Sequence, residues 1–342
     1  MRRCGGTGVQ AFVMPRLDRQ IHADPDPGIR PITDREFALF QSMIHKESGI
    51  HLAQSKRPLL VGRLSRRLRE LGLSSFGAYY RLVTEDGSDG ERRRMLDCIC
   101  TNETQFFREA RQFEFLERYI IPEWKALAAS RQRSRRVRVW SCACSTGEEP
   151  FSLAMTLLHN LTPAAGWEIE ILASDLSERA LETARMAVWP IEKARHIAPA
   201  FLRAFMLQGT RSQEGTMKAG REIRSLIRFE RVNLSGEVYP IKELFDLILC
   251  RNVLIYFNAD SRRRVIDRLL NHLAPYGYLF LGHAESLNGL ATRVRSVGPT
   301  IYMRFPDGGA SYAMHSANKK GATASVTAPV RASDHVKKRA SG

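Results

Sequence analysis

The chain has 342 residues, enough for two domains with substantial cores, and its hydrophobic content of 44% is ordinary for a globular protein. No apolar run approaches the roughly 18 residues of a membrane span, and glycines after the basic start leave no apolar segment for a signal peptide. We therefore expect a cytoplasmic protein with no membrane-inserted segment, whose net charge of +16 invites an acidic partner.

The two ends of the chain lack hydrophobic periodicity. Residues 1–30 mix Gly, Pro and Asp, and residues 307–342 are rich in Ala, Ser, Gly and Lys. We expect disordered tails in both places. The basic residues near the C-terminus therefore raise the net charge without indicating a nucleic-acid surface.

Residues 31–110 carry a helical pattern and are predicted to form an all-helical N-terminal domain. Thr33 and Glu36 have the spacing of a capping box that begins the first helix. A second helix is predicted from about residue 55 to 71, followed by Gly72 as its C-terminal glycine. Two more helices follow, one after Ser74 and one that leads into residues 101–108.

After a helical connection over residues 111–136, the pattern changes to alternating strands and helices. Near-continuous apolar runs predict strands at 137–143, 168–174, 245–251 and 277–283. Helices are predicted between them, near 148–160, 177–187 and 260–273. Two short runs, 292–297 and 300–305, predict a closing hairpin. Residues 137–306 are thus predicted to form a doubly wound, Rossmann-like α/β domain.

The six cysteines do not have the spacing of a metal or redox site. Cys98 with Cys100, and Cys142 with Cys144, are Cys-x-Cys pairs, and no histidine pair accompanies them. We interpret them as reduced core residues and expect no metal.

The segment from Trp140 to Pro150 joins the first strand to a helix through Gly147, where α/β folds hold nucleotide-like ligands. Glu148 and Glu149 stand where a dinucleotide site has glycines, and their carboxylates would repel a phosphate. A ligand with hydroxyls and a positive charge, such as S-adenosylmethionine, suits them better. The alternative is an acidic first turn that serves only the helix dipole.

Other polar residues follow the carboxyl ends of predicted strands. Asp175 ends the second strand, where an acid can accept hydrogen bonds from ribose hydroxyls or cap the next helix. Asn233 and Leu234 follow a short apolar run, at a position that can touch an adenine. Arg251 and Asn252 end the strand predicted to lie beside the first. The Asn-Pro-Pro-Tyr signature of amino-methyltransferases is absent, which argues against methylation of a base nitrogen.

Together these motifs resemble the chemotaxis-receptor methyltransferase family, CheR type. The resemblance runs from about residue 31 to 306 and rests on TNETQFFRE (101–109), VWSCACSTGEEPFSLAM (139–155), ASDLS (173–177), VNL (232–234) and FDLILCRNVLIYF (245–257). It implies an all-helical N-terminal domain joined to a class I S-adenosylmethionine-dependent methyltransferase domain. It also implies esterification of glutamate carboxylates on the cytoplasmic helical bundle of methyl-accepting chemotaxis receptors.

The resemblance also implies which residues hold the cofactor. They come from the domain junction, the glycine turn and the strand ends, namely Asn102, Thr104, Arg108, Glu149, Asp175, Asn233, Leu234, Arg251 and Asn252. Arg108 and Tyr256 resemble the pair that lies near the transferable methyl group. One departure is Trp189, which stands where the family usually has Tyr.

The residues agree with this chemistry. Methyl transfer to a carboxylate is an in-line displacement by an ionised nucleophile, so it needs no general base, and none of the motif segments contains a histidine. Positioning and orientation alone can supply about 7–11 kcal/mol. We expect Arg108 to hold the attacking glutamate, Tyr256 to orient it, and S-adenosylhomocysteine to be the product. A purely structural Arg108 is the alternative.

The basic helix near residues 55–71 is a candidate docking surface for the receptor. No acidic residue lies between Glu47 and Glu70, and the resemblance implicates this helix in receptor recognition. The alternative is an ordinary solvated helix face. The candidate docking residues are Lys56, Arg63, Arg66 and Arg67.

Residues 205–229 are predicted to form a small antiparallel β insertion, with strands at 205–207 and from Met217, joined by a loop between Gly209 and Gly215. An exposed edge there could accept an extended peptide as an added strand. Some family members bind a peptide from the receptor C-terminus in such a subdomain. Arg211, however, occupies a glycine position of that pattern, so an insertion that only caps the sheet is an equal alternative.

Two other classes of function stay open. One is a nucleic-acid methyltransferase, motivated by the charge, and the other is a non-catalytic module that senses S-adenosylmethionine. A methylated product that survives base would favour the first, because carboxyl esters hydrolyse, and binding without turnover would favour the second. We expect a monomer whose partners are receptors rather than nucleic acid.

Overall fold

The structure is a computed structural model that describes residues 2–3, 28–287 and 293–305. All the elements below belong to one compact unit, residues 1–306. The tail predicted at 307–342 and most of the tail predicted at 1–30 lie outside the described residues.

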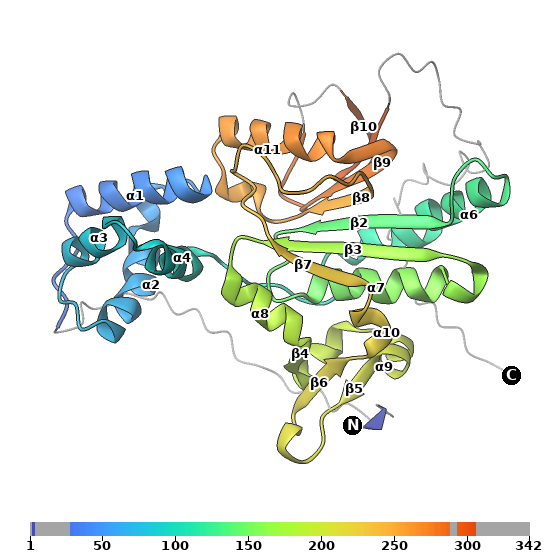
Figure 1. The fold of residues 1–342 in the computed structure, drawn as a ribbon, viewed down its shortest axis with the longest axis horizontal. Helices are drawn as coiled ribbons and strands as arrows, with labels where there is room; N and C mark the ends of the chain where they lie inside the picture. Colours follow the sequence, from blue (N-terminus) through green and yellow to red (C-terminus); the bar gives the residue numbers. More distant parts are fainter. Residues whose placement is uncertain (1, 4–27, 288–292, 306–342) are drawn as a thin grey trace, which may run out of the picture. The chain divides into compact units, whose positions relative to one another are not determined.

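The predicted helical domain consists of α1 (Asp34–Ser48), α2 (Arg57–Glu70), α3 (Phe76–Thr84) and α4 (Asp89–Ile99) (Figure 1). The capping box is present, because Thr33 Oγ1 accepts from Glu36 N at 3.2 Å and Glu36 Oε2 accepts from Thr33 N at 2.8 Å. One apolar core joins the four helices and includes Phe40, Leu64 and Tyr79. The helical N-terminal domain is confirmed.

The connection that follows is helical, as predicted. It consists of α5 (Ala110–Phe115), one π-helical turn (Leu116–Ile120) and α6 (Ile121–Ala129). Phe113, Leu116, Ile120 and Trp124 are buried in the same core as one face of the main sheet. The connection therefore packs as part of the sheet domain rather than forming a free linker.

The main sheet has the strand order β10-β11-β9-β8-β2-β3-β7. Its parallel strands are β2 (Arg136–Cys142), β3 (Glu168–Asp175), β7 (Ile227–Arg231), β8 (Phe245–Cys250) and β9 (Leu273–Leu281). The predicted hairpin, β10 (Val294–Gly298) and β11 (Ile301–Arg304), adds to β9 in the antiparallel direction. The chain reverses its direction across the sheet between β2 and β8, and α/β folds bind ligands at such a point.

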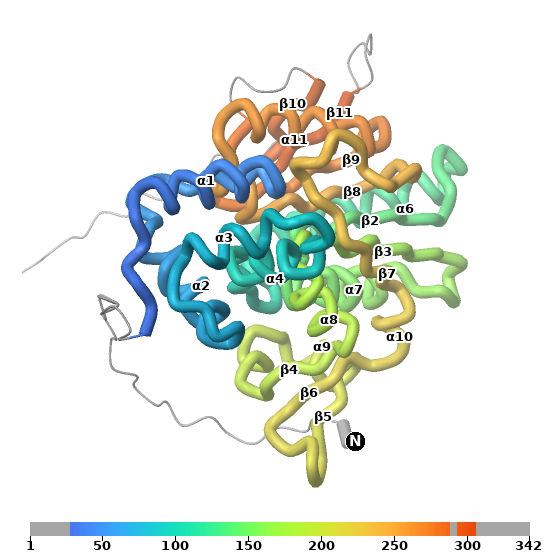
Figure 2. The backbone as a smooth tube through the Cα atoms, turned by 60° about the vertical axis from the view of Figure 1, so that its left-hand side comes forward, coloured from blue at the N-terminus to red at the C-terminus, as the bar shows by residue number. Residues whose placement is uncertain are grey.

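Helices cover both faces of this sheet. Alternate residues of β8 enter different cores: Leu247 and Leu249 pack with α7 (Glu148–Asn160), whereas Ile248 and Cys250 pack with α11 (Ala259–Asn271). Figure 1 shows α7 and α11 on opposite faces, and α8 (Glu178–Met186) follows β3. The helical domain contacts this domain where α4 lies beside α8 (Figure 2).

The predicted β insertion is confirmed in kind but is wider than predicted. Its antiparallel sheet has the order β1-β5-β6-β4, in which β5 (Met206–Gln208) and β6 (Thr216–Ala219) are the predicted pair. β4 (Val188–Pro190) lies outside the predicted 205–229 and pairs with β6. The edge of β5 is not exposed, because it pairs with β1 (Arg2–Arg3). Two short helices, α9 (Pro199–Phe205) and α10 (Arg221–Arg224), complete the subdomain.

The described cysteines are free. Cys142, Cys144 and Cys250 are buried as predicted, whereas Cys98 and Cys100 are only partly buried. Cys142 and Cys250 are neighbours in register on β2 and β8, and burial raises the pKa of the Cys142 thiol. Within the described ranges no helix is long and apolar enough to cross a membrane.

Candidate active site

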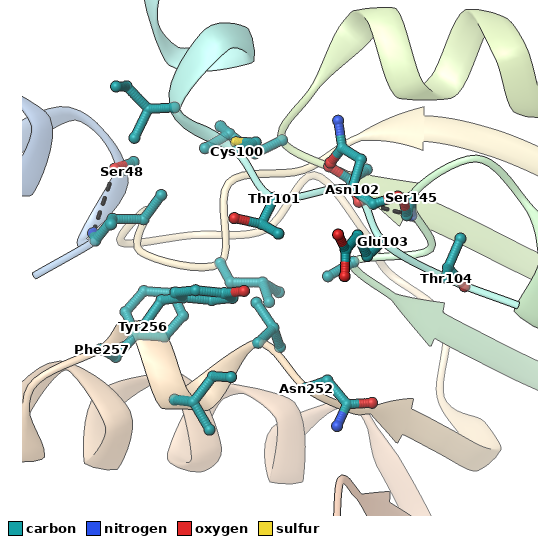
Figure 3. Close-up of a pocket in the computed structure, with 18 of the residues that line it drawn as sticks. Ser48, Cys100, Thr101, Asn102, Glu103, Thr104, Ser145, Asn252, Tyr256 and Phe257 are labelled. Atoms are coloured by element: carbon teal, nitrogen blue, oxygen red, sulfur yellow. Dashed lines mark hydrogen bonds between the residues drawn. The ribbon is translucent and has the colours of Figure 1, made fainter. Parts of the chain in front are cut away.

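One cavity of about 680 Å³ lies at the carboxyl edge of the main sheet, within the size range of small-molecule sites. The ends of β2, β3 and β8 form one wall, and residues 48–63 of the helical domain form another. Figure 3 shows Asn102 and Thr104 on one side and Asn252 and Tyr256 on the other. All the predicted cofactor residues and Tyr256 line this cavity.

The glycine turn places two neighbouring acids in different surroundings. Gly147 has a φ of +96°, and a Cβ there would lie 3.0 Å from Ala184 Cβ, so glycine lets α7 pack closely on α8. Glu148 is fully buried and pairs with Lys193 outside the cavity. Glu149 lines the cavity, where its Oε1 accepts from Ser141 Oγ at 2.7 Å.

Burial raises the pKa of Glu149, while Arg251 and the Ser141 hydrogen bond favour its ionised form. Arg251 Nη1 lies 3.3 Å from Glu149 Oε2, and Arg251 Nη2 lies 3.6 Å from Glu109 Oε2. The Arg251 side chain is 1% exposed, and its Nε and Nη1 have no hydrogen-bond partner. Buried donors without partners are costly, so this wall fits a ligand that carries an acceptor such as a carboxylate.

Asp175 lies at the cavity, whereas the cap of α8 is Ser177, whose Oγ accepts from Ala180 N at 3.2 Å. The two carboxylate oxygens of Asp175 accept from Ser145 N at 2.8 Å and from Ser177 N at 2.9 Å. Burial raises its pKa, and these backbone N–H groups oppose the shift. The carboxylate thus orients the glycine turn and the start of α8, and a carboxylate oxygen can accept more than one hydrogen bond.

The domain junction is fixed over the first turn of α7. Ser145 Oγ donates to Asn102 O at 2.9 Å, and Phe107 N donates to Ser152 Oγ at 2.9 Å. Arg108, which is partly exposed, donates from Nη1 to Glu103 O at 3.3 Å. This single long bond leaves most of the donor capacity of the guanidinium for a ligand in the cavity.

Asn233 has a role that its sequence position does not reveal. Its Nδ2 donates to Glu47 O at 2.7 Å and its Oδ1 accepts from Ser235 N at 3.0 Å. The side chain therefore ties the helical domain to the sheet domain at the cavity. Leu234 is buried beside it.

The segment after α1 forms part of the cavity wall that sequence reasoning missed. Ile50 forms a β-bridge with Phe257, and His51 N donates to Tyr256 O at 2.7 Å. Gly49 has a φ of +71°, and a Cβ there would lie 2.5 Å from Ser235 Oγ and 2.7 Å from Phe257 Cε1. In the sequence, only Gly49 marks this segment, and from the sequence alone it indicates no more than the C-cap of a helix.

The candidate docking residues do not form one surface. Lys56 and Arg63 line the cavity, and Arg63 also donates to Ile99 O and to Thr101 Oγ1. Arg66 is 78% exposed and pairs with Glu70 at 3.1 Å. Arg67 is 14% exposed and pairs with Glu91 at 2.6 Å, so its charge is used inside the helical domain.

Trp189, the departure from the resemblance, is buried in β4. Its ring packs edge-on against Phe106 and Phe151, with centroids 5.0 Å apart in each pair, and its Nε1 donates to Thr146 O at 3.1 Å. The indole therefore packs behind the glycine turn and stabilises it, and it does not line the cavity. In residues 2–3, 28–287 and 293–305, no group of three or more His, Cys, Asp or Glu side chains could hold a metal ion.

Two family models match the chain. Residues 102–303 match the model described as CheR methyltransferase, SAM binding domain, and residues 35–100 match CheR methyltransferase, all-alpha domain. The boundary falls at the junction that separates the helical domain from the sheet domain.

Curated relatives match along most of their length. The chain is 37% identical over 272 residues to the chemotaxis protein methyltransferase of Escherichia coli (strain K12), covering 79% of this chain and 91% of the relative. It is 37% identical to chemotaxis protein methyltransferase 2 of Pseudomonas aeruginosa, covering 79% and 93%. A solved glycopeptide N-methyltransferase, MtfA with S-adenosylmethionine, is similar at 16% identity and a TM-score of 0.28, covering 54% of this chain and 64% of that one. That likeness is too weak to carry an argument.

Proposed function

The chain belongs to the CheR methyltransferase family, and from this premise we propose that it methylates glutamate side chains of methyl-accepting chemotaxis receptors. The methyl donor is S-adenosylmethionine, and the products are glutamyl methyl esters and S-adenosylhomocysteine. The observation that carries the proposal is that Glu149, Asp175, Arg108 and Tyr256 line one cavity, whose other wall comes from the helical domain.

The cavity wall of the sheet suits the cofactor. When bound, S-adenosylmethionine supplies an electrophilic methyl group on a sulfonium cation. Glu149 would accept from its ammonium group, and Asp175 would accept from its ribose hydroxyls. The Nε and Nη1 groups of Arg251, which make no hydrogen bond within the protein, would hold its carboxylate. These buried groups are already oriented by protein contacts, so binding costs little reorganisation.

Arg108 and Tyr256 would hold the methyl acceptor. A guanidinium binds a carboxylate through paired hydrogen bonds and keeps it ionised, and a phenol can orient the attacking oxygen. In Figure 3 the Tyr256 hydroxyl points toward the space between the cavity walls. No proton has to be removed from an ionised glutamate, so the histidine that lines the cavity, His51, needs no part in the chemistry.

Lys56 and Arg63, which line the cavity, and Arg66, which lies further along α2 outside it, would each contact the acidic receptor bundle. Lys56 and Arg66 are exposed, and Arg63 is partly exposed between them along the chain. Arg67 is left out of this docking surface because Glu91 and Glu70 occupy its guanidinium. Charges of this kind speed encounter with an acidic partner and weaken with salt.

We also propose that the small sheet binds a receptor C-terminal peptide, although two features of the structure oppose such binding. The edge of β5 that an added strand would use is paired with Arg2–Arg3. Arg211 has a φ of +55°, a conformation that glycine adopts more easily. Titration with such a peptide should show tighter binding by a chain that lacks residues 1–27 and by Arg211→Gly. Absence of binding to all three proteins would remove the subdomain as a tether site.

The function is tested by incubating the protein with receptor cytoplasmic fragments and methyl-labelled S-adenosylmethionine. The label should enter glutamates, as mapped by mass spectrometry, and should be released by base as methanol. Arg108→Ala should abolish incorporation, whereas the matched control Arg111→Ala, an exposed neighbour, should retain it. Base-stable label on nucleic acid, or binding without turnover, would contradict the proposal.

A further inference from the structure

The loop after β8 carries the methyl-acceptor side of the cavity yet has little regular structure. Asn252, Val253, Ile255 and Tyr256 line the cavity, and only a short 3-10 turn, Leu254–Tyr256, organises them. Asn252 is in the left-handed region with a φ of +57°. Backbone N–H groups in such a loop need partners outside it if the loop is to keep one conformation.

One buried carboxylate supplies those partners. Glu285 Oε2 accepts from Asn252 N at 3.0 Å and from Gly282 N at 2.7 Å. Its Oε1 accepts from Leu254 N at 2.7 Å and from Ile255 N at 3.3 Å. Glu285 is 5% exposed, and no ion pair to it is found within the described part of the chain. All four of these donors are backbone N–H groups, which bind a carboxylate through charge-assisted hydrogen bonds.

The backbone near Glu285 packs tightly against the loop after β8. A Cβ at Gly282 would lie 2.6 Å from Asn252 N, 2.7 Å from Asn252 Nδ2 and 2.8 Å from Glu285 Oε2. Glu109 links the same elements, because its Oε1 accepts from His283 N at 3.0 Å and from Asn252 Nδ2 at 3.3 Å. The segment after β9 is thus held to the segment after β8 through two carboxylates, those of Glu285 and Glu109.

We infer that Glu285 is a positioning residue for methyl transfer, which sets the places of Asn252 and Tyr256 without touching either substrate. The inference rests on the proposed function for its kinetic consequences. Glu285 does not line the cavity, and its hydrogen bonds reach the loop on both sides of Val253. Loss of its charge frees the loop while the sheet wall with Glu149 and Asp175 stays in place.

The test compares Glu285→Gln with Asp246→Asn. Asp246 is a matched control because it is a partly buried carboxylate at the opposite end of β8 that also accepts a backbone N–H, from Arg138 at 2.8 Å. Hydrogen exchange of the amides of residues 252–255 should accelerate about tenfold or more in Glu285→Gln only, as expected for lost charged hydrogen bonds. Unchanged exchange there would overturn the inference, whatever the protein methylates.

Kinetics separates positioning from stability. The kcat for receptor methylation should fall about tenfold in Glu285→Gln, with the KM for S-adenosylmethionine changed less than about threefold. In the double variant Glu285→Gln/Tyr256→Phe, the loss of kcat should be smaller than the product of the two single losses by about threefold or more. The effects overlap because Glu285 acts through Tyr256. Glu285→Asp should restore part of the rate. Independent, multiplying effects would overturn the inference, and a wild-type protein that methylates no receptor glutamate would instead overturn the proposed function.

Discussion

The cavity has two walls built on different principles. The sheet wall contains Asp175 and Arg251, which are buried, and Glu149, whose side chain is 14% exposed. These charges are held by one another and by backbone N–H groups. The helical wall, residues 48–63, presents its cations with more exposure and fewer fixed partners. Buried, pre-oriented charges suit a small ligand, whereas exposed charges suit a large partner that brings its own acids. This difference supports the proposal that the cofactor lies against the sheet wall and that the receptor approaches the helical wall.

The largest effect should come from Arg251, which separates Glu109 and Glu149. Arg251→Met leaves two carboxylates without their buried cation and should cost about 3–5 kcal/mol of unfolding free energy. Urea denaturation measures this loss. The matched variant Arg66→Met, on the exposed face of α2, should stay within about 1 kcal/mol of the wild type. Equal losses in both variants would erase the proposed contrast between the walls.

Asp175 should show the next largest effect, on cofactor affinity. Loss of a charged hydrogen-bond partner costs about 1.5–3 kcal/mol, or roughly tenfold to a hundredfold in affinity. Calorimetric titration of Asp175→Ala with S-adenosylmethionine measures it, and circular dichroism checks the fold. Asp175→Asn, which can keep one backbone acceptor, should lose less. An unchanged affinity in both variants would remove Asp175 from the site.

Glu149 should make cofactor binding depend on pH. Burial raises its pKa, so a protonated fraction persists above the ordinary glutamate value of 4.5. Because the cofactor's ammonium favours the ionised form, affinity should fall as the pH falls through this raised pKa, by at most about tenfold per pH unit. Binding in that range should release protons, as shown by titration in buffers of different ionisation enthalpy. Glu149→Gln should bind more weakly at neutral pH with a flatter profile, and an unaltered profile would assign the titration to another group.

The smallest effect should distinguish two neighbouring arginines of α2, Arg66 and Arg67. Arg66→Glu should raise the KM for the receptor about two- to fivefold at low salt, as exposed charge pairs contribute about 0.2–1 kcal/mol, and added salt should shrink the difference. Its affinity for S-adenosylmethionine should not change. Arg67→Met should instead lower the stability of the helical domain, since it leaves Glu91 without its cation. A receptor effect confined to Arg67→Met would reverse this assignment.

Local patterns in the sequence were sufficient for most of the elements of the two domains and placed the candidate site at the carboxyl edge of the main sheet. Apolar runs predicted the strands to within a few residues, and Thr33 with Glu36 predicted the start of α1. Gly147 and Asp175 marked the ligand edge, because strand ends and glycine turns are local features of an α/β fold. The family motifs then named residues that the structure gathers around one cavity.

The sequence could not determine which ion-pair or hydrogen-bond partner each side chain contacts. Glu148 and Glu149 are adjacent, yet one turns to Lys193 and the other into the cavity, because neighbouring helix positions point in different directions. Arg67 meets Glu91 on another helix, and Asn233 reaches Glu47 across the two domains.

The small sheet and the Glu285 contacts depend in the same way on distant segments. β4 and β1 join β5 and β6 from outside the predicted insertion, and Glu285 organises a loop that begins 33 residues earlier. Helix and strand periods and caps are set by residues a few positions apart, so the sequence shows them directly. Contacts between distant segments depend on how the elements pack, and only the tertiary structure decides which of several similar charges meets which partner.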